Sequence, residues 1–326
     1  MTKRRNFLNA ISATVAGTSP ALAQRPKPLP MIGRLTPFSE TVGGGVSFVD
    51  SLGELGWYEG RNCTIVTLNA QGDFTKMEAL AAQLVALSPD VIFTPNSSDA
   101  LLLRKLTSSI PIVVGNATDP IGAGLIASYR RPGGNVTGFS WDQTPGVTAK
   151  YVEFLKEMVP NLSIVGCLID PSQNGIALYR GYFENACAAL KVKAHHKEVR
   201  VAADIASAIQ DLVAKGAQAL FCYGSSFVFR QLGHINELAV KHRLPDIYVF
   251  KEAVALGGLM SFAPNPGELG RQAARYVDKI LKGANPAELP MELPSKYELL
   301  LNRRAATRLG LKIPQILLAR ADEVID

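Results

Sequence analysis

The strongest constraint on this chain is a regular alternation of short apolar runs with segments of helical period. In the first part of the chain, strands are predicted at 28–35, 62–68, 90–94, 110–114 and 136–139, and helices at 46–55, 75–87 and 99–106. Strands that alternate with helices form parallel sheets, and helices cover both faces of such sheets. The pattern therefore predicts an α/β fold.

A second series of the same kind follows Trp141 and indicates a second, similar lobe. Its predicted elements are helices at 148–158, 176–190, 203–215 and 227–242, and strands at 164–169, 192–199, 219–223 and 247–250. The chain has 326 residues, a length at which one core usually gives way to two domains. We therefore predict two Rossmann-like lobes with parallel sheets.

The C-terminal part adds one more strand, helix and strand, at 257–263, 268–282 and 290–301. We interpret these elements as crossing back between the lobes, because each lobe otherwise lacks an edge element. The predicted N-terminal lobe comprises residues 24–140 and about 257–285. The predicted C-terminal lobe comprises residues 141–256 and about 286–326.

Residues 1–23 have the features of a twin-arginine (Tat-type) export signal. Arg4 and Arg5 precede a weakly apolar stretch at 10–17, and small residues end the segment at Ala23. We expect cleavage near Ala23 and a mature protein in a bacterial periplasm. No cysteine lies near this position, so we expect no lipid anchor.

Charge and cysteine content exclude several classes of protein. The net charge is +6 and part of it comes from the export signal, while the other basic residues are dispersed, so we expect no nucleic-acid partner. The cysteines are too far apart for a metal pattern or a disulfide-dense scaffold, and three of the four lie in apolar segments: Cys63, Cys167, Cys187 and Cys222.

The sequence shows no recognisable catalytic constellation. It has no Gly-x-Ser-x-Gly elbow, His-Glu-x-x-His motif or Walker loop, and the glycines at 43–45 lack the dinucleotide-binding spacing. His195 and His196 lie on a surface-like strand, and His234 and His242 are not spaced for a metal. We therefore expect no enzymatic activity, no metal and no cofactor.

Polar residues follow the predicted strands, where open parallel sheets bind their ligands. Thr36 and Asn116 lie at two such ends in the first lobe, and Ser97 and Ser98 open a helix whose free N–H groups favour an anion. The same residue types are also ordinary helix caps.

In the second lobe, Asp170 and Glu252 follow apolar strands and are candidates to face a ligand ammonium group. Each is equally compatible with a solvated loop. Phe38, Tyr223 and Trp141 lie beside these polar groups and could form apolar walls of a pocket, although core packing is the usual role of an aromatic ring.

Several motifs, in order along the chain, carry a resemblance to a known family. They are Asp119-Pro120-Ile121-Gly122-Ala123-Gly124-Leu125, Arg131-Pro132-Gly133-Gly134-Asn135-Val136-Thr137-Gly138, Gly257-Gly258-Leu259-Met260-Ser261-Phe262, Ile280-Leu281-Lys282-Gly283-Ala284-Asn285-Pro286 and the tail from Leu309 to Ile325. The chain resembles the ABC transporter substrate-binding proteins that include the TrpX-type tryptophan-binding proteins. The resemblance covers nearly the whole chain after residue 23.

The resemblance implies a type I periplasmic binding fold, in which three segments join two lobes that close on a ligand. It implies a monomer that hands a small solute, such as an amino acid or an aromatic or carboxylate compound, to an inner-membrane permease with a cytoplasmic ATPase. Thr118 and Asp119 match the Thr-Asp-Pro of the family, and Ser140 and Asp142 lie where its Thr-Gly-x-Ser segment enters the second lobe. After the third strand the family has Thr-Pro-Ala-Ala, whereas this chain has Thr-Pro-Asn-Ser from Thr94.

Two other functions are compatible with the same architecture. The first is a periplasmic receptor that passes its ligand state to a signalling partner. The second is an exported α/β enzyme, which would need a nucleophile and a base within reach of each other. The sequence does not identify the solute.

Overall fold

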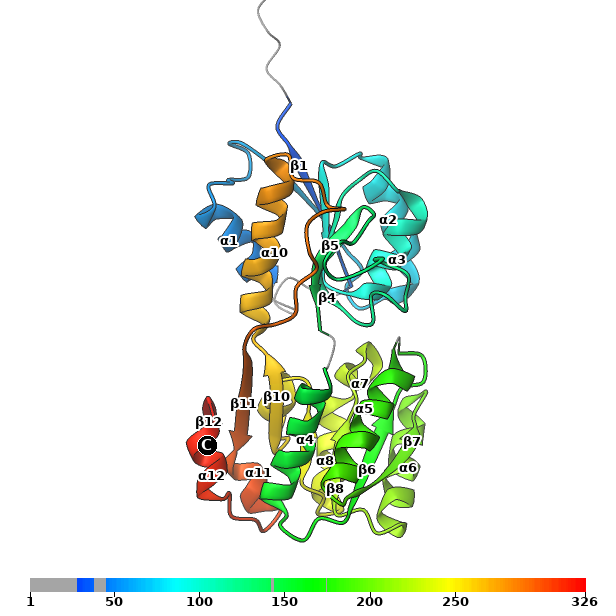
Figure 1. Ribbon diagram of the computed structural model, residues 1–326, viewed down its shortest axis with the longest axis vertical. Helices are drawn as coiled ribbons and strands as arrows, with labels where there is room; N and C mark the ends of the chain where they lie inside the picture. Colours follow the sequence, from blue (N-terminus) through cyan, green and yellow to red (C-terminus); the bar gives the residue numbers. More distant parts are fainter. Residues whose placement is uncertain (1–27, 38–44, 142–143, 174) are drawn as a thin grey trace, which may run out of the picture.

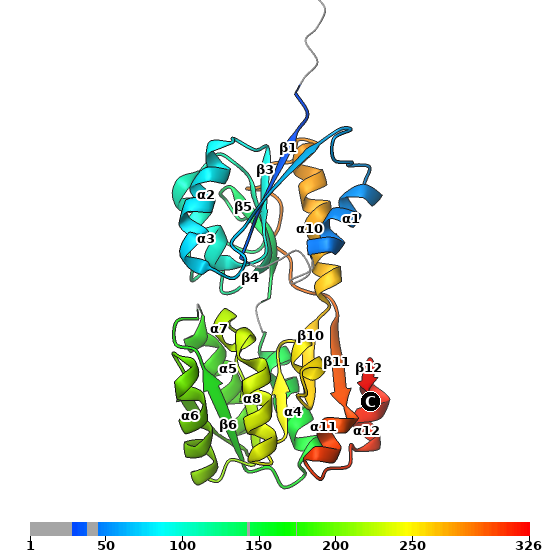
Figure 2. The same cartoon turned by 180° about the vertical axis from the view of Figure 1, so that it is seen from behind.

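A computed structural model describes residues 28–37, 45–141, 144–173 and 175–326, with the backbone alone for 45–47 and 266–269. Two lobes follow one another along the long axis, and each has a central sheet between helices (Figures 1 and 2). The predicted export signal, Phe38 and Asp142 lie outside the described residues. The two-lobed α/β architecture predicted from the sequence is confirmed.

The sheet of the first lobe has five parallel strands in the order β2-β1-β3-β4-β5. Their bounds are β1 (Met31–Thr36), β2 (Thr64–Asn69), β3 (Val91–Thr94), β4 (Ile112–Ala117) and β5 (Val136–Ser140). Buried side chains alternate between the two faces: Val91 and Phe93 belong to one apolar cluster and Ile92 to the other. Both faces are therefore covered, as a parallel sheet requires.

Among the described residues, four α-helices cover this sheet. They are α1 (Gly45–Glu54) and α10 (Pro266–Leu281) on one face, and α2 (Met77–Ala86) and α3 (Ser97–Leu106) on the other, with the short helix η1 (Phe74–Lys76) directly before α2. Helices α1 and α10 lie side by side although they are distant in the sequence (Figure 2).

The sheet of the second lobe has seven strands in the order β12-β11-β10-β9-β8-β6-β7. Their bounds are β6 (Ile164–Ile169), β7 (Lys193–Glu198), β8 (Ala219–Cys222), β9 (Asp246–Tyr248), β10 (Met260–Pro264), β11 (Tyr297–Asn302) and β12 (Glu323–Ile325). All neighbours are parallel except β10 and β11.

Helices again cover both faces of this second sheet. One apolar cluster joins it to α4 (Pro145–Met158), α5 (Ile176–Ala189), α11 (Arg303–Arg308) and α12 (Gln315–Arg320). The other cluster joins it to α6 (Ala202–Ala214), α7 (Ser226–Arg230), α8 (Leu232–Lys241) and α9 (Glu252–Ala255). The helix predicted at 227–242 is thus divided into α7 and α8.

The chain crosses between the lobes three times: after β5, after β10 and before β11 (Figure 1). The crossings do not coincide with the predicted lobe boundaries. Strand β10 was predicted in the first lobe but pairs with β9 in the second sheet, and the chain returns to the first lobe at α10. Residues 286–292 were predicted in the second lobe, yet Met291 is buried in the first-lobe core and the backbone of Glu292 bonds to Gly138 and Ser140.

Three further observations on the described residues concern the sequence predictions. All four cysteines are free and buried. No described helix has both the length and the apolar character needed to span a bilayer. The described residues also contain no group of three or more His, Cys, Asp or Glu placed to hold a metal ion.

Candidate functional site

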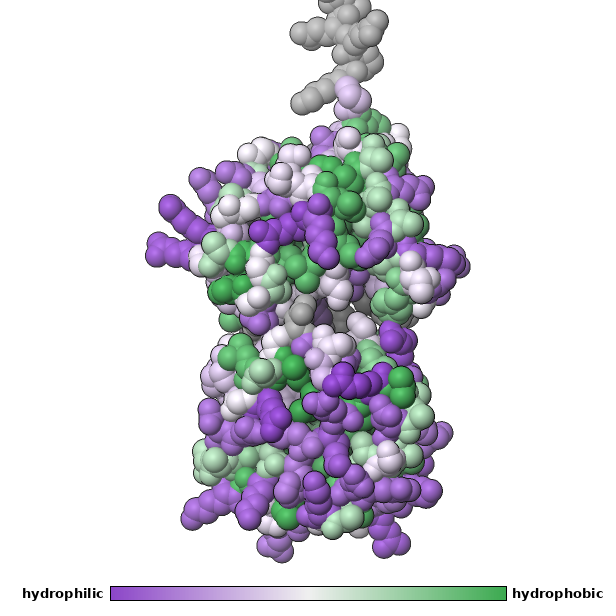
Figure 3. Space-filling model, turned by 90° about the vertical axis from the view of Figure 1, so that its right-hand side faces the viewer, coloured by the Kyte–Doolittle hydropathy of each residue, from purple (hydrophilic) through white to green (hydrophobic). Residues whose placement is uncertain are grey.

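The carboxyl ends of the strands in the two lobes face each other across a cavity of about 480 Å³. In each lobe the first two strands are swapped in the sheet order, so β1 lies beside β3 and β6 beside β8. Ligands of open α/β sheets bind at such topological switch points. A hollow is visible at the waist between the lobes (Figure 3).

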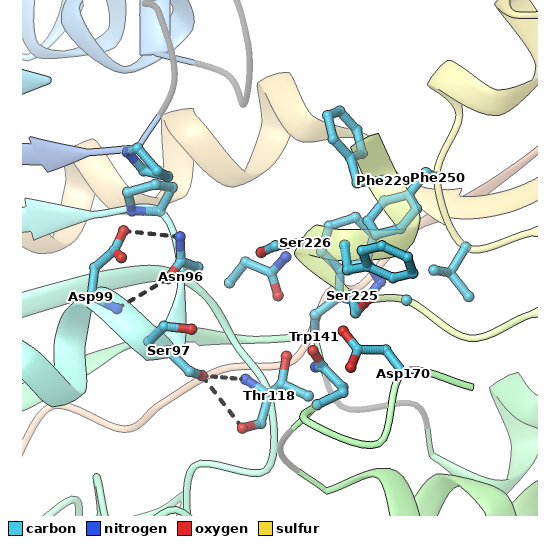
Figure 4. A pocket seen from close by; sticks show the side chains of 18 of the residues that line it. Asn96, Ser97, Asp99, Thr118, Trp141, Asp170, Ser225, Ser226, Phe229 and Phe250 are labelled. Atoms are coloured by element: carbon cyan, nitrogen blue, oxygen red, sulfur yellow. Dashed lines mark hydrogen bonds between the residues drawn. The ribbon is translucent and has the colours of Figure 1, made fainter. Parts of the chain in front are cut away.

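The structure brings most of the predicted site residues to this cavity. Those that line it are Thr36, Ser97, Ser98, Asn116, Thr118, Asp170, Tyr223 and Glu252. They come from both lobes, with neutral polar groups on the first lobe and two carboxylates on the second (Figure 4). Asp119 and Ser140 are described but do not line the cavity.

Ser140 and Asp119 have other partners. The Ser140 hydroxyl is buried and donates to the Ala117 carbonyl at 2.9 Å, which ties the end of β5 to β4. The Asp119 carboxylate accepts from the N–H of Gly122 at 3.0 Å and closes a turn. The Asp119 backbone N–H donates at 3.1 Å to the hydroxyl of Tyr179 on α5, so this residue forms a contact between the lobes.

The first turn of α3 presents polar groups of the first lobe. Asn96 is its N-cap: the Asn96 carboxamide oxygen accepts from the Asp99 N–H at 3.1 Å, and its amide group donates to Asp99 Oδ2 at 2.9 Å. The Ser97 hydroxyl accepts from the Thr118 N–H at 2.7 Å. The exposed Ser98 hydroxyl has no hydrogen-bond partner among the described residues and is free to bind a ligand.

Asp99 is a buried acid directly behind this turn (Figure 4). Burial raises its pKa to about 7, although hydrogen bonds from Thr94 and Asn96 act in the opposite direction. The carboxyl group is therefore partly protonated near neutral pH. The carboxyl group accepts from the Asn96 amide group, and the Asp99 backbone N–H donates to the Asn96 carboxamide oxygen, so Asp99 fixes the orientation of that side chain at the cavity wall.

The second lobe contributes acidic groups. Asp170 is 7% exposed, and its Oδ1 accepts from the backbone N–H and the hydroxyl of Ser172 at 2.9 and 2.6 Å. Its Oδ2 has no hydrogen-bond partner in the part of the chain that the structure describes. Glu252 is the first residue of α9 and is half-buried at the same cavity. Arg230 of α7 also lines this lobe's side of the cavity, so it is the positions next to Asp170 and Glu252 that suit a cationic group.

Aromatic rings form much of the remaining wall. Phe250 meets Trp141 and Phe229 edge-on, with centroids 6.0 and 5.2 Å apart. Phe93 closes the first-lobe side and is stacked on Phe48 behind it at 4.2 Å. The sequence prediction included Trp141 but missed Phe93, Phe229 and Phe250. In the sequence, only their position near strand or helix ends distinguishes these three residues from aromatic residues of the core.

Tyr223 lines the cavity, but most of its side chain is enclosed by other residues. Its ring is 2% exposed and packs against Phe183 and Phe221, and its hydroxyl lies 3.2 Å from His196 Nε2. Burial lowers the pKa of His196 to about 4, with a further contribution from Arg180. The strand of His196 was predicted to be surface-like, whereas this imidazole is nearly buried and supports Tyr223 from behind.

Besides the contact of Trp141 with Phe250, two contacts between described residues join the lobes directly beside the cavity. The first is the hydrogen bond between Asp119 and Tyr179. The second is the Arg230 guanidinium, whose central carbon lies 4.7 Å from the centroid of the Phe74 ring. Arg230 belongs to α7 of the second lobe and Phe74 to η1 of the first. The structure therefore shows the lobes in contact around the cavity.

Comparisons with known proteins agree with this geometry. The family described as ABC transporter substrate binding protein matches residues 39–325. A tyrosine-binding protein of Clostridioides difficile (strain R20291) is 24% identical over 259 residues, which cover 78% of this chain and 73% of that protein.

Solved structures are similar over nearly the whole chain. The ABC domain from Streptococcus pneumonia in complex with L-Trp has a TM-score of 0.84 and 27% identity, with 91% of this chain and 100% of that chain covered. A conserved domain protein from Vibrio cholerae has a TM-score of 0.83 and 27% identity, with 90% and 99% covered.

The fold is that of type I periplasmic binding proteins, and the family and its solved neighbours are solute-binding proteins rather than enzymes. Proteins of this family bind a small molecule, work with an ABC permease and are typically extracytoplasmic. With its two lobes around a shared cavity and a match over residues 39–325, the chain belongs to the ABC transporter substrate-binding protein family.

Proposed function

We propose that this protein captures an amino acid, or an aromatic or carboxylate compound, between its lobes and delivers it to an inner-membrane ABC permease. The observation that carries the proposal is the cavity itself, which has the hydroxyls and the first turn of α3 on one lobe, Asp170 and Glu252 on the other, and aromatic walls; Asp99 behind that turn and Arg230 of the second lobe also line it. The tyrosine- and tryptophan-binding relatives support this class of solute.

In the proposed complex, the two lobes hold opposite ends of the solute. Ser98, Thr118 and the first turn of α3 bind an anionic end, because hydroxyls and free N–H groups at a helix N-terminus stabilise negative charge. Asp170 and Glu252 face a cationic end. The aromatic side chains around Phe250 contact the apolar part of the solute.

Closure of the hinge is the proposed mechanism. A solute that touches both lobes binds the closed state better than the open state, and only this difference in affinity shifts the equilibrium. We further propose that residues 1–23 direct Tat-type export, that cleavage near Ala23 releases the protein into the periplasm, and that it acts there as a monomer with a permease coupled to a cytoplasmic ATPase.

A ligand screen followed by calorimetry tests the proposal. A solute at about 100 times its dissociation constant stabilises the protein by roughly 2.7 kcal/mol, which a thermal-shift assay of amino acids and aromatic carboxylates will detect. With the solute that is found, Ser98→Ala and Glu252→Ala should each weaken binding by about tenfold or more.

Matched controls are Ser207→Ala and Glu237→Ala, which alter exposed residues on α6 and α8 away from the cavity. Their dissociation constants should equal that of the unaltered protein. If Ser98→Ala and Glu252→Ala also bind like the controls, the proposed site is wrong.

A further inference from the structure

Two residues that line the cavity each have a buried polar atom without a hydrogen-bond partner among the residues that the structure describes. These atoms are the indole Nε1 of Trp141 and the carboxamide oxygen of Asn116. An indole N–H can only donate, and the carboxamide oxygen can only accept. Buried polar groups are rarely left unpaired because this loses their hydrogen bonds to water, so each such atom needs an explanation.

The fold places these two residues at neighbouring strand ends. Asn116 and Ala117 end β4, and the Ala117 carbonyl accepts from the backbone N–H of Trp141 at 2.7 Å. Trp141 directly follows β5, at the first crossing between the lobes. Both residues therefore project from neighbouring strand ends, which is where the cavity lies.

Both lobes position the Trp141 ring. It packs against the first-lobe cluster that includes Phe139 and meets Phe250 of the second lobe edge-on at 6.0 Å. Figure 4 shows Trp141 between Thr118 of the first lobe and Asp170 of the second. A hydrogen bond from this indole to a solute would thus form at the hinge, where the relative position of the two lobes decides whether the bond can form.

The other tryptophan shows that this chain can satisfy a buried indole. Trp57 Nε1 donates to Asp278 Oδ1 at 2.9 Å, and Trp57 does not line the cavity. The unpaired indole N–H belongs to the tryptophan that lines the cavity. The unpaired oxygen of Asn116 in the same cavity is an independent sign that a solute supplies the missing partners.

We propose that Trp141 and Asn116 together bind one polar end of the solute, which accepts from the Trp141 indole and donates to the Asn116 carboxamide oxygen. This inference rests on the proposed function and narrows its solute class. The solute must carry an N–H or O–H donor as well as an acceptor. An ionised carboxylic acid without a donor satisfies Trp141 alone and leaves Asn116 unpaired.

Calorimetric titration with L-tyrosine and L-tryptophan tests the role of Trp141. Trp141→Phe keeps an aromatic ring but removes the N–H, and should weaken binding by about tenfold. Trp57→Phe is the matched control and should bind like the unaltered protein. If Trp141→Phe also binds like the unaltered protein, the inference is overturned.

An NMR titration separates a lost hydrogen bond from altered packing. The two indole N–H signals are assigned with Trp57→Phe, and the Trp141 signal should shift downfield on saturation with the amino acid while the Trp57 signal stays in place. An unmoved Trp141 signal in a saturated protein contradicts the inference even if Trp141→Phe binds weakly.

Asn116→Leu tests the donor on the solute, with L-tyrosine and its deaminated analogue 3-(4-hydroxyphenyl)propionate as probes. A loss of about tenfold for L-tyrosine alone identifies the ammonium as the donor, and an equal loss for both identifies the phenol. Unchanged L-tyrosine binding overturns the role of Asn116. If neither amino acid binds the unaltered protein at millimolar concentration, the inference and the amino-acid form of the proposed function both fail.

Discussion

Asp99 should make the stability of the protein depend on pH. Its pKa is raised from 3.8 to about 7 by burial. Between these two values the unfolded chain loses the proton while the folded protein keeps it, so the free energy of unfolding falls as pH rises from about 4 to 7. Asp99→Asn removes this dependence. Relative to the unaltered protein, the free energy of unfolding of the variant should rise by roughly 4 kcal/mol between pH 4 and pH 8, measured by urea denaturation.

A parallel pH dependence in the two proteins would contradict this prediction. Asn also keeps an oxygen that can accept from Thr94 and Asn96, so the cap of α3 is preserved in the variant.

His196 should act in the opposite direction over a similar pH range. Burial, Arg180 and His195 lower its pKa from 6.5 to about 4, while Glu184 acts against them. As pH falls from 6.5 to 4, the unfolded chain takes up a proton that the folded protein does not, so the free energy of unfolding falls. His196→Gln should therefore lose less stability than the unaltered protein between pH 7 and pH 4, by roughly 2 kcal/mol in urea denaturation.

The measurement for His196 has a built-in check. At pH 7 to 8 the difference in stability between the two proteins should be constant, because the imidazole is neutral in both folded and unfolded chains there. A difference that varies only above pH 7 would contradict the assignment.

At the scale of the elements, Gly138 determines how β5 pairs with β4. Its φ is +126°, and a Cβ built there lies 2.2 Å from the Val114 carbonyl oxygen. Backbone atoms of a central strand cannot move aside as a side chain can. Gly138→Ala should cost about 3 kcal/mol or more in the free energy of unfolding, measured by chemical denaturation.

Gly134→Ala is the matched control for Gly138. A Cβ at Gly134 has no heavy atom within 4 Å, so this variant should stay within about 0.5 kcal/mol of the unaltered protein. Equal stability of the two alanine variants would show that the β4–β5 pairing does not require glycine.

Most elements could be predicted from the sequence because each has its own periodicity. The strand predicted at 164–169 has the bounds of β6, and the helix predicted at 176–190 is α5 with one residue more. The three-residue β12 and four-residue α9 were missed because they are too short to show a period. Strand β10 belongs to the second sheet because it pairs with β9 and β11. The local sequence pattern does not show such long-range pairing.

The candidate site was predicted only in part, for a related reason. The rule that ligands bind at strand ends found Thr36, Asn116 and Asp170, since strand ends are visible in the sequence. Ser140 was selected from the family resemblance, and in the structure its hydroxyl ties two strands together instead of lining the cavity. Arg230 was missed because its helix was predicted as a long continuous one with no boundary near it.

For the whole molecule, closure should be stabilised by the contact between Arg230 and Phe74 across the cavity mouth. A cation–π contact at an exposed site contributes about 0.5–1 kcal/mol. Arg230→Gln should therefore speed solute release by about twofold to fivefold and leave the association rate nearly unchanged, as measured by stopped-flow fluorescence.

Arg200→Gln, on the surface of the second lobe next to Glu198, is the control and should change neither rate. A slower association with unchanged release in Arg230→Gln would mean that Arg230 guides the solute inward rather than holding the lobes together.

The central claim is that one solute is enclosed between the two lobes at the facing strand ends. A crystal structure of the protein with the solute found in the thermal-shift screen tests it most directly. The account predicts a solute between the first turn of α3 and Asp170, within hydrogen-bond distance of Ser98 or Thr118 on one lobe and of Asp170 or Glu252 on the other. A solute bound to one lobe alone, or outside this cavity, would contradict it.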